Sequence, residues 1–107
     1  MSLILMPNPP RDDAVSVEVG QRLSRVRDAL GLTQEQLADA LNVGRTTLAN
    51  WETGVRLADV AAIARMSVRF GPVLEWVYNG STASMPNWLV EKVLAEEPAE
   101  KKRQRSA

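Results

Sequence analysis

Residues 32–54 read LTQEQLADALNVGRTTLANWETG and contain two short helical patterns close together. Apolar residues recur at the spacing of one helix face in each half of it: Leu37, Ala38 and Leu41, then Leu48 and Trp51. Only the short segment 42–44 separates the two patterns. The stretch therefore predicts two short helices joined by a tight turn, with the small side chain of Ala38 where they meet.

The ends of these two helices are also marked in the sequence. Thr33 is followed three residues later by Gln36, which predicts a capping box that satisfies free backbone N–H groups at the helix start. We expect the following helix to run from about Arg45 to Glu52 and to end at Gly54. The two helices are thus defined by local chemistry as well as by apolar spacing.

Four further segments show apolar residues at helical spacing: Val15, Val19, Leu23, Val26 and Leu30; Val60, Ile63, Met66 and Phe70; Leu74, Trp76 and Val77; and Trp88, Leu89, Val93 and Leu94. Glycine or proline separates these segments from one another, and strand-like aromatic and β-branched runs are absent. The fold class expected is all-α. We divide the chain into a flexible N-terminal arm (1–13), a helical domain (14–80), a linker with a C-terminal helix (81–97) and a disordered charged tail (98–107).

Composition excludes several classes of function. The 107 residues include no cysteine and no histidine, which rules out disulfides, thiol catalysis, Cys/His zinc sites and histidine-based acid–base chemistry. No nucleophile–base spacing, glycine-rich phosphate loop or metal cluster appears, so we expect neither an enzyme nor a cofactor. The apolar run near the N-terminus is too short for a signal peptide or a membrane span, so we expect a cytoplasmic protein.

Net charge leaves the partner open. Thirteen basic and thirteen acidic side chains balance to zero, which argues mildly against a nucleic-acid partner. From Arg11 to Phe70, however, every cation is an arginine, the residue best suited to bidentate contacts with phosphate and guanine.

The segment 32–54, with RLSRVRDALG before it and VLEWVYNG after it, resembles the Cro/C1-type (XRE-like) helix-turn-helix family of bacterial and phage repressors. The resemblance covers roughly Val17 to Gly80. It implies a compact five-helix, lambda-repressor-like DNA-binding domain, here with an additional C-terminal helix. The helix at about 45–52 would lie in the DNA major groove, which admits one helix.

The resemblance also implies roles for individual residues. Base edges would be read by Arg45, Thr46 and Asn50, and DNA phosphates would be contacted by Gln34, Thr47, Thr53 and Arg56. Arg27 and Glu52 would form a structural ion pair between helices. Gly44 departs from the family pattern, which has serine or threonine as the cap of the recognition helix.

Each of these assigned roles has an ordinary structural alternative. Arg45, Arg56 and Asn50 are also compatible with solvated surface positions, and Gln34 caps its helix whether or not it meets a phosphate. In the C-terminal helix, Trp88, Leu89, Val93 and Leu94 are candidate contacts with a second copy, although Trp88 would also suit packing within one chain. The tail KKRQR is either a solvated end or a basic arm on DNA.

Two functions of different classes follow. The first is a sequence-specific, repressor-like transcriptional regulator that binds double-stranded DNA, as a homodimer on a palindromic operator and without a small-molecule ligand. The second is a protein-interaction module or antitoxin-like partner that retains the fold. The acidic residues Glu35 and Asp39 on the first helix of the pair keep the second function open.

Overall fold

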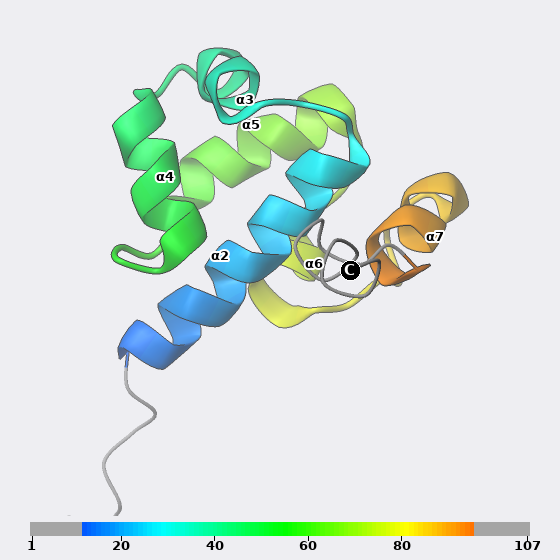
Figure 1. The fold of residues 1–107 in the computed structure, drawn as a ribbon. Helices are drawn as coiled ribbons and strands as arrows, with labels where there is room; N and C mark the ends of the chain where they lie inside the picture. Colours follow the sequence, from blue (N-terminus) through cyan, green and yellow to red (C-terminus); the bar gives the residue numbers. More distant parts are fainter. Residues whose placement is uncertain (1–11, 96–107) are drawn as a thin grey trace, which may run out of the picture.

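The computed structural model describes residues 12–95, and helices account for most of them. The six helices of this range are α2 (Asp12–Ala29), α3 (Gln34–Leu41), α4 (Arg45–Thr53), α5 (Val60–Phe70), α6 (Leu74–Asn79) and α7 (Asn87–Ala95). No strand occurs between residues 12 and 95, which confirms the all-α prediction. In Figure 1 the long helix α2 crosses the molecule, with α4 on one side of it and α7 on the other.

Local chemistry sets the ends of the helices. The predicted capping box is present: the Thr33 hydroxyl accepts the Gln36 N–H at 3.0 Å, and the Gln36 side chain accepts the Thr33 N–H at 2.9 Å. Asn42 ends α3 in the left-handed conformation, with φ at 60°. Asp59 caps α5 by accepting the Ala62 N–H at 3.1 Å. Each of these bonds satisfies backbone groups that a helix end leaves without a partner.

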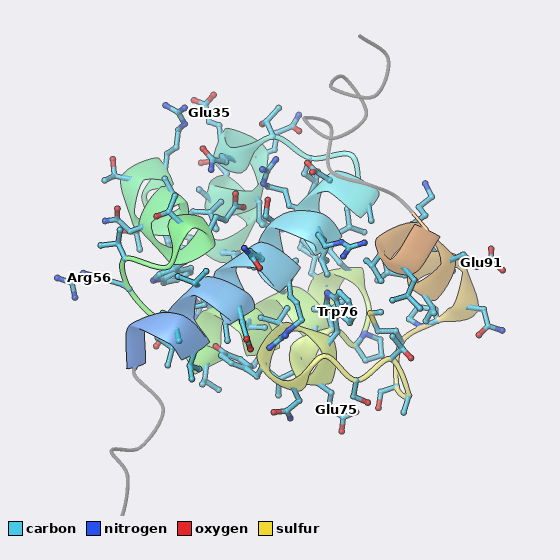
Figure 2. The ribbon with its side chains drawn as sticks, turned by 60° about the horizontal axis from the view of Figure 1, so that its bottom comes forward. Glu35, Arg56, Glu75, Trp76 and Glu91 are labelled. Carbon is cyan, nitrogen blue, oxygen red and sulfur yellow. The ribbon has the colours of Figure 1, made fainter. Side chains whose placement is uncertain are left out.

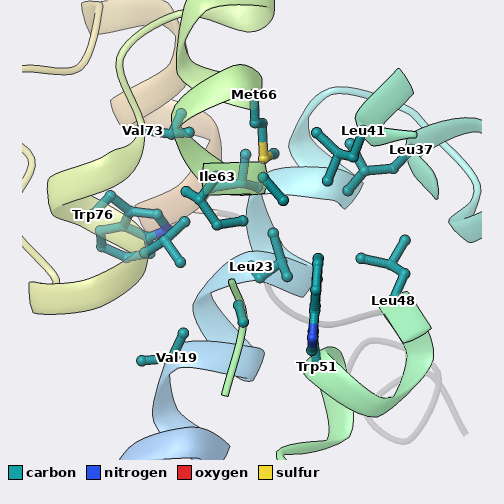
Figure 3. Packing of buried hydrophobic residues seen from close by; sticks show 14 of the residues in the cluster. Val19, Leu23, Leu37, Leu41, Leu48, Trp51, Ile63, Met66, Val73 and Trp76 are labelled. Atoms are coloured by element: carbon teal, nitrogen blue, oxygen red, sulfur yellow. The ribbon is translucent and has the colours of Figure 1, made fainter. Parts of the chain in front are cut away.

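One apolar core joins all six helices (Figure 3). Two predicted core positions are wrong, because Val15 is 43% exposed and Val60 is 58% exposed. Val15 lies near the N-terminal end of α2. On α5 the buried face instead comprises Ala62, Ile63 and Met66, and Val60 points away from it.

Hydrogen bonds between distant segments hold α6 against the rest of the bundle. Arg22 donates to the carbonyl oxygens of Val77 at 3.0 Å and Tyr78 at 3.1 Å, and so caps the end of α6. The Trp76 indole N–H donates back to the Arg22 carbonyl at 3.2 Å. The Tyr78 hydroxyl donates to the Ala58 carbonyl at 2.7 Å, which fixes the segment that follows α4.

The C-terminal helix belongs to the same bundle. Leu89 and Val93 of α7, with Met85 just before it, are buried in the common core. The predicted arm and tail lie outside the described residues, except that 12 and 13 belong to α2. Residues 81–86 connect α6 to α7 and are tied down locally, because the Ser84 hydroxyl donates to the Glu75 carboxylate at 2.9 Å.

Candidate nucleic-acid interface

Helix α4 presents one apolar side to the core and one polar side to solvent. Leu48 and Trp51 are buried, and both point into the core in Figure 3. Arg45, Thr46 and Thr47 are exposed on the opposite side, while Asn50 is half-buried. The residues that the family resemblance assigns to base reading therefore lie on the outer side of α4 or at its edge.

The backbone of α2 lies directly against the end of α4. A Cβ atom on Gly20 would overlap the Trp51 carbonyl oxygen and would lie 2.7 Å from that of Glu52. One turn earlier, the Cα atom of Val17 lies 2.6 Å from the place where a Cβ on Gly54 would be. Since only glycine fits between these backbones, Gly20 sets how closely α4 sits on α2.

Gly20 is not among the residues that the sequence patterns pointed to. A signal for it was present, because a glycine inside an apolar helical pattern costs about 1 kcal/mol relative to alanine and so calls for a packing reason. The sequence could not identify α4 as the element that approaches it.

A buried ion pair ties the end of α4 to the end of α2. Arg27 Nε donates to Glu52 Oε2 at 2.7 Å, and Arg27 Nη2 donates to Glu52 Oε1 at 3.1 Å. Arg27 also donates to the Leu32 carbonyl at 2.9 Å. Burial by itself lowers the pKa of Arg27, but the hydrogen bond and charge of Glu52, helped by the charge of Asp28, outweigh burial and raise the pKa. The arginine therefore stays charged and links α2, the turn before α3, and α4.

Gln34 joins the same cluster. Its side-chain Nε2 donates to Glu52 Oε1 at 3.0 Å, so the carboxamide is held against the end of α4. An amide nitrogen has two N–H donors, and this bond uses one of them. A phosphate at the start of α3 would meet the remaining donor and the first-turn backbone N–H groups. Glu35, exposed on the same turn, opposes such an anion (Figure 2).

The other three phosphate-contact candidates differ in what they offer. The Thr53 hydroxyl donates to the Ala49 carbonyl at 3.0 Å, so it would have to rotate before it could donate to a phosphate. Thr47 is exposed on α4. Arg56 follows α4 and extends away from the bundle in Figure 2, while its backbone N–H donates to the Asn50 carbonyl at 3.2 Å.

The four candidate dimer residues of α7 separate into two pairs. Leu89 and Val93 point into the core of their own chain, so their side chains have no surface to offer a second copy. Trp88 and Leu94 are 50% and 58% exposed, on a helix that lies across α2 from α4 (Figure 1). The prediction of a contact with a second copy thus retains only Trp88 and Leu94.

Neither a metal-binding cluster nor a membrane-spanning helix occurs in the part of the chain that the structure describes. No group of three or more carboxylates within 12–95 could hold a metal ion. Within the same residues, no helix has both the length and the apolar character needed to cross a bilayer.

Known proteins resemble this chain over the segment that contains α3 and α4. A helix-turn-helix family model matches residues 23–73, the segment that contains α3 and α4. The chain is 31% identical over 64 residues to the HTH-type transcriptional activator BcrR of Enterococcus faecalis, an alignment that covers 60% of this chain and 31% of the relative. It is 27% identical over 71 residues to the HTH-type transcriptional regulator ImmR of Bacillus subtilis (strain 168), covering 66% of this chain and 56% of the relative.

The aligned segment therefore spans about a third of the length of BcrR and just over half of the length of ImmR. No solved structure matches the chain. The family match falls on the helices whose geometry is described above, with Leu48 and Trp51 inward and the polar side of α4 outward. Over residues 23–73, just under half of its length, the chain is similar to the helix-turn-helix family.

Proposed function

We propose that this protein is a non-enzymatic, sequence-specific DNA-binding transcriptional regulator that inserts α4 into the major groove. The observation that carries the proposal is the exposed outer side of α4, where Arg45, Thr46 and Thr47 project from a helix anchored by Leu48 and Trp51. A rigid helix with exposed polar side chains suits the width of the major groove. Two relatives named as transcriptional regulators support the same function.

Arg45, Thr46 and Asn50 are the proposed base-reading residues. Arg45 suits bidentate contact with guanine and Asn50 with adenine, and each such pair contributes about 1–3 kcal/mol of discrimination. Gln34, Thr47, Thr53 and Arg56 are the proposed phosphate contacts, which position the protein without reading sequence. The proposal extends to a homodimer on a palindromic operator, with cytoplasmic location and repressor-like action through occupancy of that operator.

Selection of bound duplexes from a random pool tests this function. We expect a two-fold consensus, and we expect binding to weaken steeply with salt because phosphate contacts release counterions. Arg45→Ala should relax the preference at one base pair of each half-site, whereas Arg56→Ala should weaken binding to all sequences alike and reduce the salt slope by about 1.

Lys92→Ala is the matched control, since it removes a cation from α7 on the far side of α2. The proposal fails if no duplex in the pool is enriched, or if Arg45→Ala leaves the base preference intact.

A protein-interaction module of antitoxin type is the second candidate. The exposed carboxylates of Glu35 and Asp39 on α3 favour it, because they lie on the helix that would brace α4 against the phosphate backbone. Binding to a protein partner would show a shallow salt dependence, and the salt slope therefore separates the two functions.

A further inference from the structure

Helix α5 carries apolar side chains on both its inner and its outer side. Its inner side packs into the core, where Figure 3 shows Ile63 and Met66. Its outer side exposes two valines, Val60 at 58% and Val68 at 89%. A surface helix ordinarily turns polar side chains to solvent, and here the exposed Arg65 and Arg69 flank the two valines, so an apolar stripe of α5 stays uncovered within the described residues. Together with the exposed Ala61 and Ala64, the two valines form what we call the α5 outer face.

The α5 outer face is self-complementary in one register. Val60 and Val68 lie four residues on either side of Ala64. If two copies pack antiparallel about a two-fold axis at Ala64, Val60 of each copy meets the partner's Val68. The small Ala64 side chains face each other at the axis and let the helix axes approach to about 8 Å. Such a contact is isologous and closes on two copies.

Charge at the two ends of α5 favours the antiparallel direction. Exposed Asp59 caps the first turn, and exposed Arg69 lies in the last turn. No acidic residue lies between them on the helix. Antiparallel packing brings the Asp59 end of each copy to the Arg69 end of the other, and it also opposes the two helix dipoles. Parallel packing would bring like ends together.

The other exposed apolar surface, on α7, lacks this complementarity. Trp88 and Leu94 lie three residues on either side of exposed Glu91. An antiparallel contact that covers both apolar side chains would therefore place two Glu91 carboxylates opposite each other at the two-fold axis. Like charges in that position oppose association.

We propose that the α5 outer face binds a second copy of this chain, antiparallel and centred on Ala64. The inference rests on the proposed function only in the expectation that two copies act together. Its experiments use no DNA, so they succeed or fail separately from the test of DNA reading.

Disulfide cross-linking tests the register, because the chain has no cysteine of its own. We expect Ala64→Cys to form a covalent dimer under mild oxidation. Facing residues at a two-fold axis come within the Cα separation of about 4.4–6.8 Å that a disulfide usually requires. Val68→Cys alone should stay monomeric, because the rise of α5 places its two copies about 12 Å apart. An equal mixture of Val60→Cys and Val68→Cys chains should form the mixed dimer.

Cross-linking of Trp88→Cys in place of Ala64→Cys would overturn the inference in favour of α7. Equal cross-linking of every variant would also overturn it, because random collision would then explain the dimers.

Sedimentation equilibrium of the full chain tests the contact without a covalent bond. Val68→Glu should weaken dimerisation by about tenfold or more, whereas the thermal stability of the monomer, measured at high dilution, should stay unchanged because Val68 is almost fully exposed in the single chain. Val55→Glu is the matched control: Val55 is 71% exposed but lies outside the α5 outer face, so its substitution should leave dimerisation unchanged. A wild-type chain that stays monomeric up to millimolar concentration contradicts the inference, and so does a Val68→Glu chain that dimerises normally.

Discussion

Gly20 determines how closely α4 packs against α2. Gly20 lies in the interior of α2, where helix propensity alone would favour alanine, yet the Trp51 carbonyl occupies the space that a methyl group would need. Because the obstacle is backbone rather than a flexible side chain, it cannot yield without moving α4.

We therefore expect Gly20→Ala to lower the free energy of unfolding by about 1–3 kcal/mol, the usual cost of overpacking, despite the better helix propensity of alanine. Urea unfolding followed by tryptophan fluorescence measures the change. A Gly20→Ala chain as stable as the wild type would show that α2 and α4 do not meet as closely as described.

Tyr78 links the ionisation of one side chain to the stability of the fold. Burial, together with the negative charge of Asp59, raises the pKa of Tyr78 from 10.0 to about 12. The unfolded chain thus loses the phenolic proton at lower pH than the folded chain. The stability contributed by Tyr78 is complete below pH 10.0 and is lost as pH rises through about 12.

We expect thermal stability to fall across that window, and we expect Tyr78→Phe to reduce the fall. Tyr78 is the single tyrosine of the chain, so ultraviolet absorbance of the phenolate reports its ionisation directly. A phenol that titrates at its ordinary pKa in the folded protein would contradict the expectation.

Between elements, the Arg27–Glu52 pair holds the two ends of the helix-turn-helix unit together. Both side chains are largely buried, at 15% and 5% exposed, and Arg27 also anchors the Leu32 carbonyl before α3. Removing one partner of a buried pair leaves the other charge without compensation. Arg27→Ala should therefore cost about 3–5 kcal/mol of unfolding free energy.

Arg56→Ala is the comparison, since the exposed Arg56 should change stability by less than about 0.5 kcal/mol. Chemical denaturation of both variants decides the matter, and equal losses in the two would show that the buried pair is not special.

The elements differ in how far the sequence could predict them. The capping box of Thr33 and Gln36 was predictable because all its atoms belong to four consecutive residues. The partner of the Gln34 side chain was not, because Glu52 comes near it only once α3 and α4 have packed. Val15 and Val60 have the right spacing for a core face, but spacing does not show where neighbouring helices stop covering a helix.

At the scale of the whole molecule, α7 completes the core rather than standing apart from it. The sequence predicted a separate C-terminal element and could not say which apolar residues of α7 turn inward, because this depends on how the 81–86 connection delivers the helix. Leu89→Ala should cost about 2–5 kcal/mol of unfolding free energy through the cavity that it leaves. Trp88→Ala, at a half-exposed neighbouring position, should cost far less. Thermal melting of the two variants compares them, and the reverse order would mean that α7 is turned the other way.

Because α2 packs closely against α4, the parts of α4 that hold the helix in place differ from the side chains that face solvent. Backbone atoms and inward side chains keep the helix in place, so Arg45, Thr46 and Thr47 contribute little to stability. Exchanging the codons of Arg45 and Thr46, two of the proposed base-reading residues, should therefore change the DNA sequence that the protein prefers while its melting temperature stays the same. Substitutions on the outer side of α4 therefore change the binding preference of such a protein while its core residues stay the same.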